Sequence, residues 1–333
     1  RPFRMSRAKS GMTRRSLIIA AAIWLGFAVL PLLVDDWQLL QLAQFMTYGI
    51  FAMSLALIWG QAGMLCFGQA IFFGGGAYAV RLVTMGMIPY VPANSWLGLI
   101  AAMALPAVFA NLLGRFLFYG KGLRGAHFGI VTLAIAVIAE RLAINWEFIG
   151  GFNGLMGVPP MNLGLGGDLI DGMPVYYAVL AVAVIVFALL AAMLSTPFGL
   201  ALNALRNNED RAAFLGYDNA RLKLAVFTIA AAVAGLSGAL FVAQFAFASP
   251  TLLGFGLSTE VLIWTALGGK SLLIAAFLGA VVVRVAENFL SEILGPLWLL
   301  GLGGLFVLCV IFFPRGLIAE ILLRIERLLP GAK

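Results

Sequence analysis

Charged side chains are scarce in this sequence. Asp, Glu, Lys and Arg account for 11% of the 333 residues, whereas hydrophobic residues account for 63%, and the mean hydropathy is +1.05. A soluble globular domain carries about 25% charged residues, so this composition excludes that class of protein. The apolar runs are continuous rather than alternating, which also excludes a transmembrane barrel. The fold class is therefore predicted to be all-α, a polytopic membrane protein.

Residues that carry enzymatic chemistry are also scarce. The single histidine, His127, has no partner at metal-ligand spacing, so it is interpreted as an interfacial residue and no metal site is expected. Cys66 and Cys309 lie among apolar neighbours, which predicts free buried thiols and no disulfide framework. The sequence has no Ser/His/Asp, HExxH or CxxC arrangement and no Walker-type phosphate loop. We therefore expect a protein that is not an enzyme, needs no cofactor and does not hydrolyse ATP by itself.

Uncharged runs predict about ten membrane segments, some of them short or broken, at about 20 residues per crossing. They are residues 16–34, 37–80 as two helices, 82–114 with a break between 86 and 96, 125–144, 175–194, 224–247, 258–267, 271–290 and 296–313. The run 258–267 is too short to cross a hydrocarbon core of about 30 Å, so it is predicted to be a half-helix. Residues 16–317 thus form one transmembrane domain.

Basic residues set the predicted orientation. They cluster in residues 1–15, 121–124, 206–223 and 315–333, and an excess of Lys and Arg marks cytoplasmic loops. Both ends, residues 1–15 and the amphipathic tail 318–333, are therefore expected in the cytoplasm. The net charge of +7 reflects this asymmetry and does not indicate nucleic-acid binding.

An acidic, turn-rich loop is expected on the outer side. Residues 146–173 contain no Lys or Arg and are rich in Gly, Asn and Pro. The loop is long for a connector, which favours a docking surface or an outer gate over a plain link. The residues predicted for that role are Gly151, Phe152, Asn153 and Gly154.

One polar island, residues 206–223, separates two long apolar runs, 172–205 and 224–259. Its Ala-centred middle, residues 208–215, favours a short helix, and Gly216 follows where a helix could stop. A solvated connector is the plain interpretation. The shape instead predicts a helix on the membrane surface that is available to a partner.

Two glycine-interrupted segments, residues 60–79 and 258–269, lie in the two halves of the chain. Short or broken segments in matching positions indicate a substrate path near the membrane midplane. Close helix packing through small residues is the alternative, although the triplet Gly74–Gly76 favours local unwinding. The predicted pathway residues are Phe72, Phe73, Gly74, Gly75, Gly76, Tyr78, Glu260, Gly268 and Gly269.

Three carboxylates lie in apolar surroundings: Glu140, Glu260 and Glu287. Intramembrane acids are costly and are consistent with a proton relay or ion coupling. We favour interfacial placement instead, with Glu260 at the start of the half-helix, where it would complement the helix dipole. In that interpretation Glu287 pairs with Arg284, three residues before it, and Glu140 lies near a membrane end.

Six stretches of the sequence follow one another in a recognisable order. They are GQAGMLCFGQAIFFGGGAYA (60–79), LRGAHFGIVTLA (123–134), GGFNGLMGVPP (150–160), the long stretch 196–241, ALGGK (266–270) and FFPRGL (312–317). In this order they resemble the membrane subunits of bacterial branched-chain amino acid ABC importers, the LivM-type permeases, and their urea- and amide-transporting relatives. The sequence departs from that pattern at His127, where an aromatic residue is expected, and after Lys270, where SLL replaces a Gly-rich continuation.

The resemblance implies a set of partners. A LivH-type permease subunit would complete the pore, two cytoplasmic subunits would bind ATP and Mg, and a periplasmic protein would bind the substrate, all at a bacterial inner membrane. The island corresponds to the family's coupling loop, residues 195–223, whose short helix contacts the ATPase. Carried over, the contact residues are Asn208, Glu209, Asp210, Arg211, Ala212, Ala213 and Gly216.

The expected function is inward transport of a small solute by alternating access, most simply a branched-chain amino acid. Few fixed charges line the predicted pathway, so urea, short amides and small aromatic acids stay open as solutes. A self-contained secondary transporter coupled to protons or Na⁺ through Glu260 or Glu287 is the second hypothesis. A passive channel is the third and weaker one.

Overall fold

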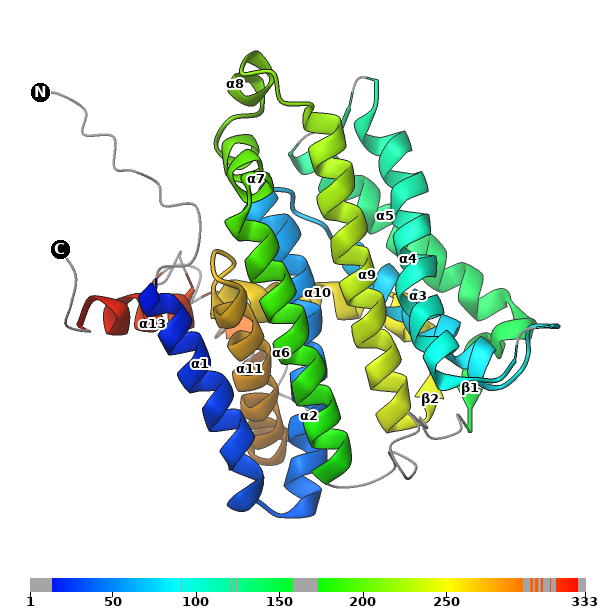
Figure 1. Ribbon diagram of the computed structural model, residues 1–333. Helices are drawn as coiled ribbons and strands as arrows, with labels where there is room; N and C mark the ends of the chain where they lie inside the picture. The colour runs from blue at the N-terminus through cyan, green and yellow to red at the C-terminus, as the bar shows by residue number, and fades with distance from the viewer. Residues whose placement is uncertain are drawn as a thin grey trace, which may run out of the picture.

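The computed structural model describes residues 14–90, 92–120, 122–123, 125–157, 173–295 and 316–328, together with a few single residues between 300 and 312. Helices dominate these ranges (Figure 1), as expected for an all-α membrane protein. The expected segment 296–313, Cys309, Lys121, Arg124 and the loop residues 158–172 lie outside the described residues. Cys66 is buried as a free thiol, and His127 is exposed at the start of its helix.

Seven of the described helices are long and apolar enough to cross a membrane. They are α1 (Arg14–Val29, extended by the 3-10 turn η1, Leu30–Leu32), α2 (Asp36–Leu55), α4 (Ser95–Phe118), α5 (Ala126–Asn145), α6 (Met173–Ser195), α9 (Asn219–Phe245) and α11 (Leu273–Leu294). Two more apolar helices are shorter: α3 (Gln69–Thr84) has 16 residues and α10 (Phe255–Gly268) has 14. At 1.5 Å per residue they reach only about 24 and 21 Å, so the half-helix predicted near residues 258–267 is present.

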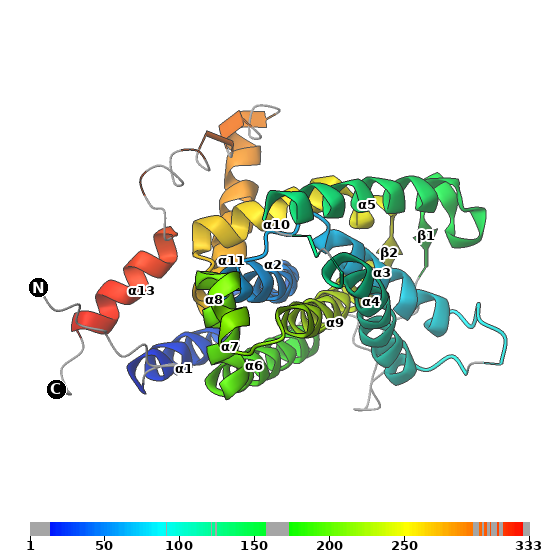
Figure 2. The ribbon, with the colours of Figure 1, turned by 90° about the horizontal axis from the view of Figure 1, so that it is seen from above.

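The bundle is built around α2 and α9, whose apolar stretches are 83% and 72% buried. Viewed from above, α2 lies between α11 and α9, and α4 and α6 lie outside them (Figure 2). Small residues allow this close approach. A Cβ atom on Gly235 of α9 would overlap the carbonyl oxygen of Ala102 in α4, and one on Gly238 would overlap the carbonyl oxygen of Phe73 in α3.

The glycine triplet is helical, so the predicted local unwinding at Gly74–Gly76 is wrong. Regular helix α3 runs through all three residues. Because these glycines have no side chains, neighbouring segments can pack closely against α3. A Cβ on Gly76 would overlap Gly235, and one on Gly74 would press on Leu253. The irregular backbone lies upstream, in a π-helical turn η2 (Ala56–Gln61) and the non-helical residues 63–68.

A small cap closes one part of the bundle beside α3 and α5. It consists of η3 (Glu147–Ile149), η4 (Gly151–Asn153) and β1 (Leu155–Met156), with β1 antiparallel to β2 (Phe247–Ala248), followed by η5 (Pro250–Leu253). Arg81, fully buried at the end of α3, donates hydrogen bonds to the carbonyl oxygens of Ala246 and Met156. This one guanidinium therefore ties strand β1 and the residue before strand β2 to the membrane helix.

The remaining helices lie away from the cap. Helix α7 (Pro197–Asn207) and helix α8 (Glu209–Phe214) join α6 to α9, and α8 stands at the far end of the bundle from β1 and β2 (Figure 1). The amphipathic tail is helix α13 (Leu317–Leu328), close to the predicted range.

Candidate coupling and translocation sites

The polar island folds into a capped helix, as its sequence predicts. The Asn208 side chain accepts a hydrogen bond from the backbone N–H of Arg211 at 2.9 Å, which caps α8. Helix α8 ends at Phe214, two residues before Gly216, whose φ of +87° allows the chain to reverse. The sequence prediction missed that helix α7 fills the first part of the loop.

An ion pair fixes α8 to the base of α9. Lys223 Nζ lies 2.7 Å from the Glu209 carboxylate, with a lysine side chain only 6% exposed, and Asn219 donates to the Glu209 carbonyl oxygen at 2.7 Å. Ala212 is buried against its own chain. Of the carried-over contact residues, Ala212 therefore anchors the helix, whereas Asp210, Arg211, Ala213 and Gly216 are exposed.

Two apolar side chains that the sequence prediction overlooked stand out at the end of α8. Phe214 is 91% exposed and Leu215 is 74% exposed. The sequence could have indicated them, because large apolar residues are unusual within a charged, solvated segment. Together with the exposed Ala213 they give this end of α8 an apolar tip, and the exposed Asp210 and Arg211 lie in the preceding turn.

A second set of contacts links this loop to the helices of the membrane domain. Arg206, the penultimate residue of α7, donates to the carbonyl oxygen of Gly60 at 2.6 Å, within the π-helical turn η2. The Lys270 ammonium lies 4.6 Å from the centroid of the Trp59 ring, and burial together with the nearby Arg206 lowers the pKa of Lys270. We call this contact between α7, η2 and the α10–α11 turn the inner junction.

The predicted pathway residues of α3 are interior residues of this chain. Phe72, Phe73 and Tyr78 are nearly fully buried. Phe73 packs on Phe51 and on Tyr48, with ring centroids 4.8 and 6.3 Å apart. Their pathway role stays a prediction, and their position makes them part of the aromatic core around α2.

Gly268 and Gly269 lie at the other end of the predicted pathway, where α10 ends. Gly268 packs against Ala275 and Gly279 of α11, and Gly269 has a φ of +120° at the turn. These two glycines let the short helix turn back against the spanning helix. A role in the pathway stays a prediction for them as well.

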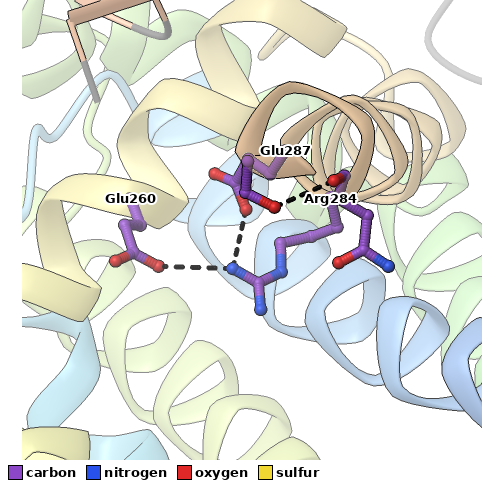
Figure 3. A network of polar contacts seen from close by, with 5 residues as sticks. Glu260, Arg284 and Glu287 are labelled. Carbon is purple, nitrogen blue, oxygen red and sulfur yellow. Dashed lines mark hydrogen bonds and ion pairs between the residues drawn. The ribbon is translucent and has the colours of Figure 1, made fainter. Parts of the chain in front are cut away.

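Three charged side chains from α10 and α11 meet in the structure (Figure 3). The Arg284 guanidinium lies 2.7 Å from the Glu287 carboxylate and 4.0 Å from that of Glu260. The same guanidinium stacks over Tyr48, with its carbon 4.7 Å from the ring centroid, and lies 5.7 Å from that of Trp264. The expected pairing of Glu287 with Arg284 is confirmed, and we call the three residues the charged cluster.

The predicted place of Glu260 at the start of the half-helix is wrong. Helix α10 begins at Phe255, so Glu260 lies in its second turn and faces Arg284. The acid at the helix start is Glu140 of α5, whose carboxylate oxygens lie 2.6 and 3.0 Å from the position that a Cβ on Gly254, the N-cap, would take. A carboxylate there favours the positive end of the helix.

The predicted outer gate residues are part of the cap. Gly151 is buried, Phe152 is 79% exposed, and Gly154 lies so close to Ala248 that a Cβ would overlap its carbonyl oxygen. Asn153 ends η4 and is exposed. A docking or gating role for these residues stays a prediction.

Comparison with known proteins places the chain. Residues 39–312 match the family described as the permease component of branched-chain amino acid transport systems. The chain belongs to this family. It is 31% identical to the high-affinity branched-chain amino acid transport system permease protein LivM of Salmonella typhimurium, over 94% of this chain and 76% of that protein.

Other curated relatives agree with this placement. LivM of Escherichia coli is also 31% identical over 94% of this chain and 76% of its own length. A probable LivM of Methanocaldococcus jannaschii is 27% identical over 58% of this chain and 64% of its own length. No solved structure matches significantly. The resemblance drawn from the sequence motifs is thus confirmed.

Family membership settles the broad role of this multi-pass membrane protein. It is a permease subunit of a transport system, not an enzyme, and such a subunit works with other components of an ABC transporter. Residues 195–223, which we call the coupling segment after the role proposed for them, reach out of the bundle, whereas the charged cluster lies within it.

Proposed function

We propose that this chain is the LivM-type subunit of an importer that moves branched-chain amino acids from the periplasm across the bacterial inner membrane. In this proposal both termini and α8 face the cytoplasm. The observation that carries the proposal is the anchored helix α8, which presents Phe214 and Leu215 at its tip. A free apolar tip of this kind favours a protein partner that covers it.

The proposed partners are a LivH-type permease subunit, two ATP-binding subunits and a periplasmic binding protein. Helix α8 would seat in a groove of one ATP-binding subunit. Because the Glu209–Lys223 ion pair fixes α8 to α9, closure of the ATPase pair would tilt α8 and α9 as one body. The cap, with Phe152 exposed, would receive the binding protein on the opposite side.

The inner junction gives this movement a second route into the bundle. Arg206 lies in the last turn of α7, just before α8, and donates a hydrogen bond to the carbonyl oxygen of Gly60 at 2.6 Å. That carbonyl belongs to a π-helical turn, a form of helix that is frequent at functional positions. We propose that the junction passes displacement of the coupling segment to α2 and to the turn between α10 and α11.

A test of this function uses the chain reconstituted in proteoliposomes with its three kinds of partner. ATP-driven uptake of leucine is expected only when the ATP-binding subunits are present. Ala213→Glu, which puts a carboxylate beside the apolar tip, is expected to abolish this uptake while the complex still assembles. Unchanged uptake by that variant would refute the contact assigned to α8.

Ion coupling is the second candidate, because the charged cluster places two carboxylates on apolar helices. It predicts uptake by the isolated chain in response to a proton or Na⁺ gradient, without any ATPase. The same assay can be run with urea and short amides in place of leucine. Import of urea but not leucine would reassign the solute while leaving the ATP-driven mechanism in place.

A further inference from the structure

The charged cluster lies at middle depth of a spanning helix. Arg284 is the twelfth of the 22 residues of α11, which places it about 16 Å from either end at 1.5 Å per residue. Glu260 reaches it from the short helix α10 (Figure 3). Ionised groups at such a depth are costly and are typical of functional sites, and sites near the midplane are commonly built from short or broken helices.

The cluster is more than a closed structural ion pair. Arg284 and Glu287 already satisfy one another at 2.7 Å, with the Glu287 side chain only 7% exposed. Glu260 adds a second carboxylate that is 41% exposed and reaches only to 4.0 Å. If the Arg284–Glu287 ion pair served folding alone, Glu260 would add little to its stability, because 4.0 Å is too long for a hydrogen bond to the guanidinium.

Hydrogen-bonding capacity within the cluster is also left over. Arg284 Nε and Glu287 Oε1 are buried without a hydrogen-bond partner in the described part of the chain. Buried polar atoms without partners are rare because each costs free energy. The guanidinium has five N–H donors, and its contact with Glu287 uses only Nη1. The cluster can therefore accept both an anionic and a cationic group.

Aromatic rings border the cluster on one side. Tyr48 and Trp264 pack with ring centroids 5.0 Å apart, and the Arg284 guanidinium lies over both. Tyr48 continues to Phe241 at 5.7 Å and to Phe73 at 6.3 Å. Buried aromatic rings thus lie directly behind the charges, an environment that suits the side chain of an apolar amino acid.

We propose that the charged cluster recognises the zwitterionic head group of a transported apolar amino acid. Arg284 takes the carboxylate, Glu260 takes the ammonium group, and the apolar side chain lies against Tyr48 and Trp264. Glu287 is a positioning residue that holds the guanidinium. This inference rests on the proposed function, and it excludes a neutral solute such as urea as the preferred ligand, since urea offers no charge to either group.

The experiment measures ligand binding to the detergent-purified complex of permease and ATPase subunits without the periplasmic protein. The probes are leucine, 4-methylpentanoate, which lacks the ammonium group, and 3-methylbutylamine, which lacks the carboxylate. Glu260→Gln is expected to weaken leucine binding by about tenfold or more, the size of one charged hydrogen bond. It should leave the weaker binding of 4-methylpentanoate unchanged, because that probe never used Glu260.

A charge swap separates recognition from folding. Arg284→Glu combined with Glu287→Arg keeps an ion pair between the same two positions, so a merely structural pair would tolerate it. Recognition predicts that leucine binding is lost although the complex assembles with a normal melting temperature. The matched control is Glu320→Gln with Arg324→Gln, which removes a partly exposed pair on α13 and should change neither binding nor assembly.

Two results with the variants would overturn the inference. One is equal weakening of leucine and 4-methylpentanoate binding by Glu260→Gln, and the other is full leucine binding by the charge-swapped complex. Absence of leucine binding to a wild-type complex that still imports leucine would also refute it, while leaving the proposed function intact. Failure of the complete wild-type system to import leucine at all would instead refute the proposed function.

Discussion

Glu209 of α8 and Lys223 of α9 form an ion pair, with 2.7 Å between carboxylate and ammonium. They are fourteen residues apart in the chain, and the lysine is almost completely buried at the base of α9. The pair lies where α8 meets a central helix of the bundle. Its geometry makes α8 an extension of α9 rather than a loose loop.

Lys223→Met is therefore expected to loosen α8. It removes the ammonium group that the half-buried Glu209 carboxylate contacts, at a cost of about 1–3 kcal/mol. Thermal unfolding of the complex should show this loss, and ATP-driven uptake should fall several-fold while ATP hydrolysis persists. The double variant Glu209→Gln with Lys223→Met should regain part of the stability. A double variant less stable than the single one would contradict the pairing.

The glycine triplet offers a matched pair of substitutions. Gly76→Ala would drive a methyl group into the backbone of Gly235, whereas the same change at Gly75 meets only Pro106 at an ordinary 3.7 Å. We expect Gly76→Ala to cost about 1–3 kcal/mol through overpacking, and Gly75→Ala to be neutral or slightly stabilising. Melting temperatures of the two variants provide the check. Equal effects would show that α3 and α9 are not packed this closely.

These residues also show what the sequence could predict. Positions of helices followed from local chemistry: Gly216 ends the surface helix, and the prolines between residues 86 and 96 separate α3 from α4. The role of the glycine triplet Gly74–Gly76 could not be predicted in this way, because small residues favour both local unwinding and close helix packing. Only the position of Gly235 on another helix decides between them.

The charged cluster shows the same limit more clearly. Arg284 and Glu287 are three residues apart on one helix, so their pairing was predictable. Glu260 joins them only because α10 turns back at Gly269 and packs along α11, which depends on the rotation of both helices. The mistaken N-terminal place of Glu260 came from setting the start of α10 too late, whereas Glu140, distant in sequence, fills that place.

The lowered pKa of Lys270 at the inner junction predicts that the stability of the protein depends on pH. Burial and the nearby Arg206 lower its pKa in the folded protein, whereas the unfolded chain keeps a value near about 10.4. Between these two pKa values the unfolded state binds more protons, so the free energy of unfolding rises with pH across this alkaline window. Lys270→Met should remove that rise. The check is the difference between the melting temperatures of wild type and variant from neutral pH to pH 10.5, and a constant difference would contradict the shift.

Arg206 is expected to affect the coupling of ATP hydrolysis to transport more than the stability of the protein. Its guanidinium donates to Gly60 at 2.6 Å and to Asn203 at 3.0 Å, so Arg206→Met removes the contact between α7 and the π-helical turn. The side chain is largely exposed, and the lost stability should be about 1 kcal/mol or less. Uptake of leucine per ATP hydrolysed should nevertheless fall several-fold, because α8 would then move without moving α2.

Arg221→Met is the control for that prediction. Arg221 carries the same charge in the same island and pairs only locally with Asp218, with 78% of its side chain exposed. Loss of one positive charge from the same polar island is thus common to both variants, and only Arg206→Met breaks the junction. If both variants lower uptake equally while ATP hydrolysis is unchanged, surface charge explains the effect. A drop confined to Arg206→Met identifies the hydrogen bond to Gly60 as the connection between the coupling segment and the central helix.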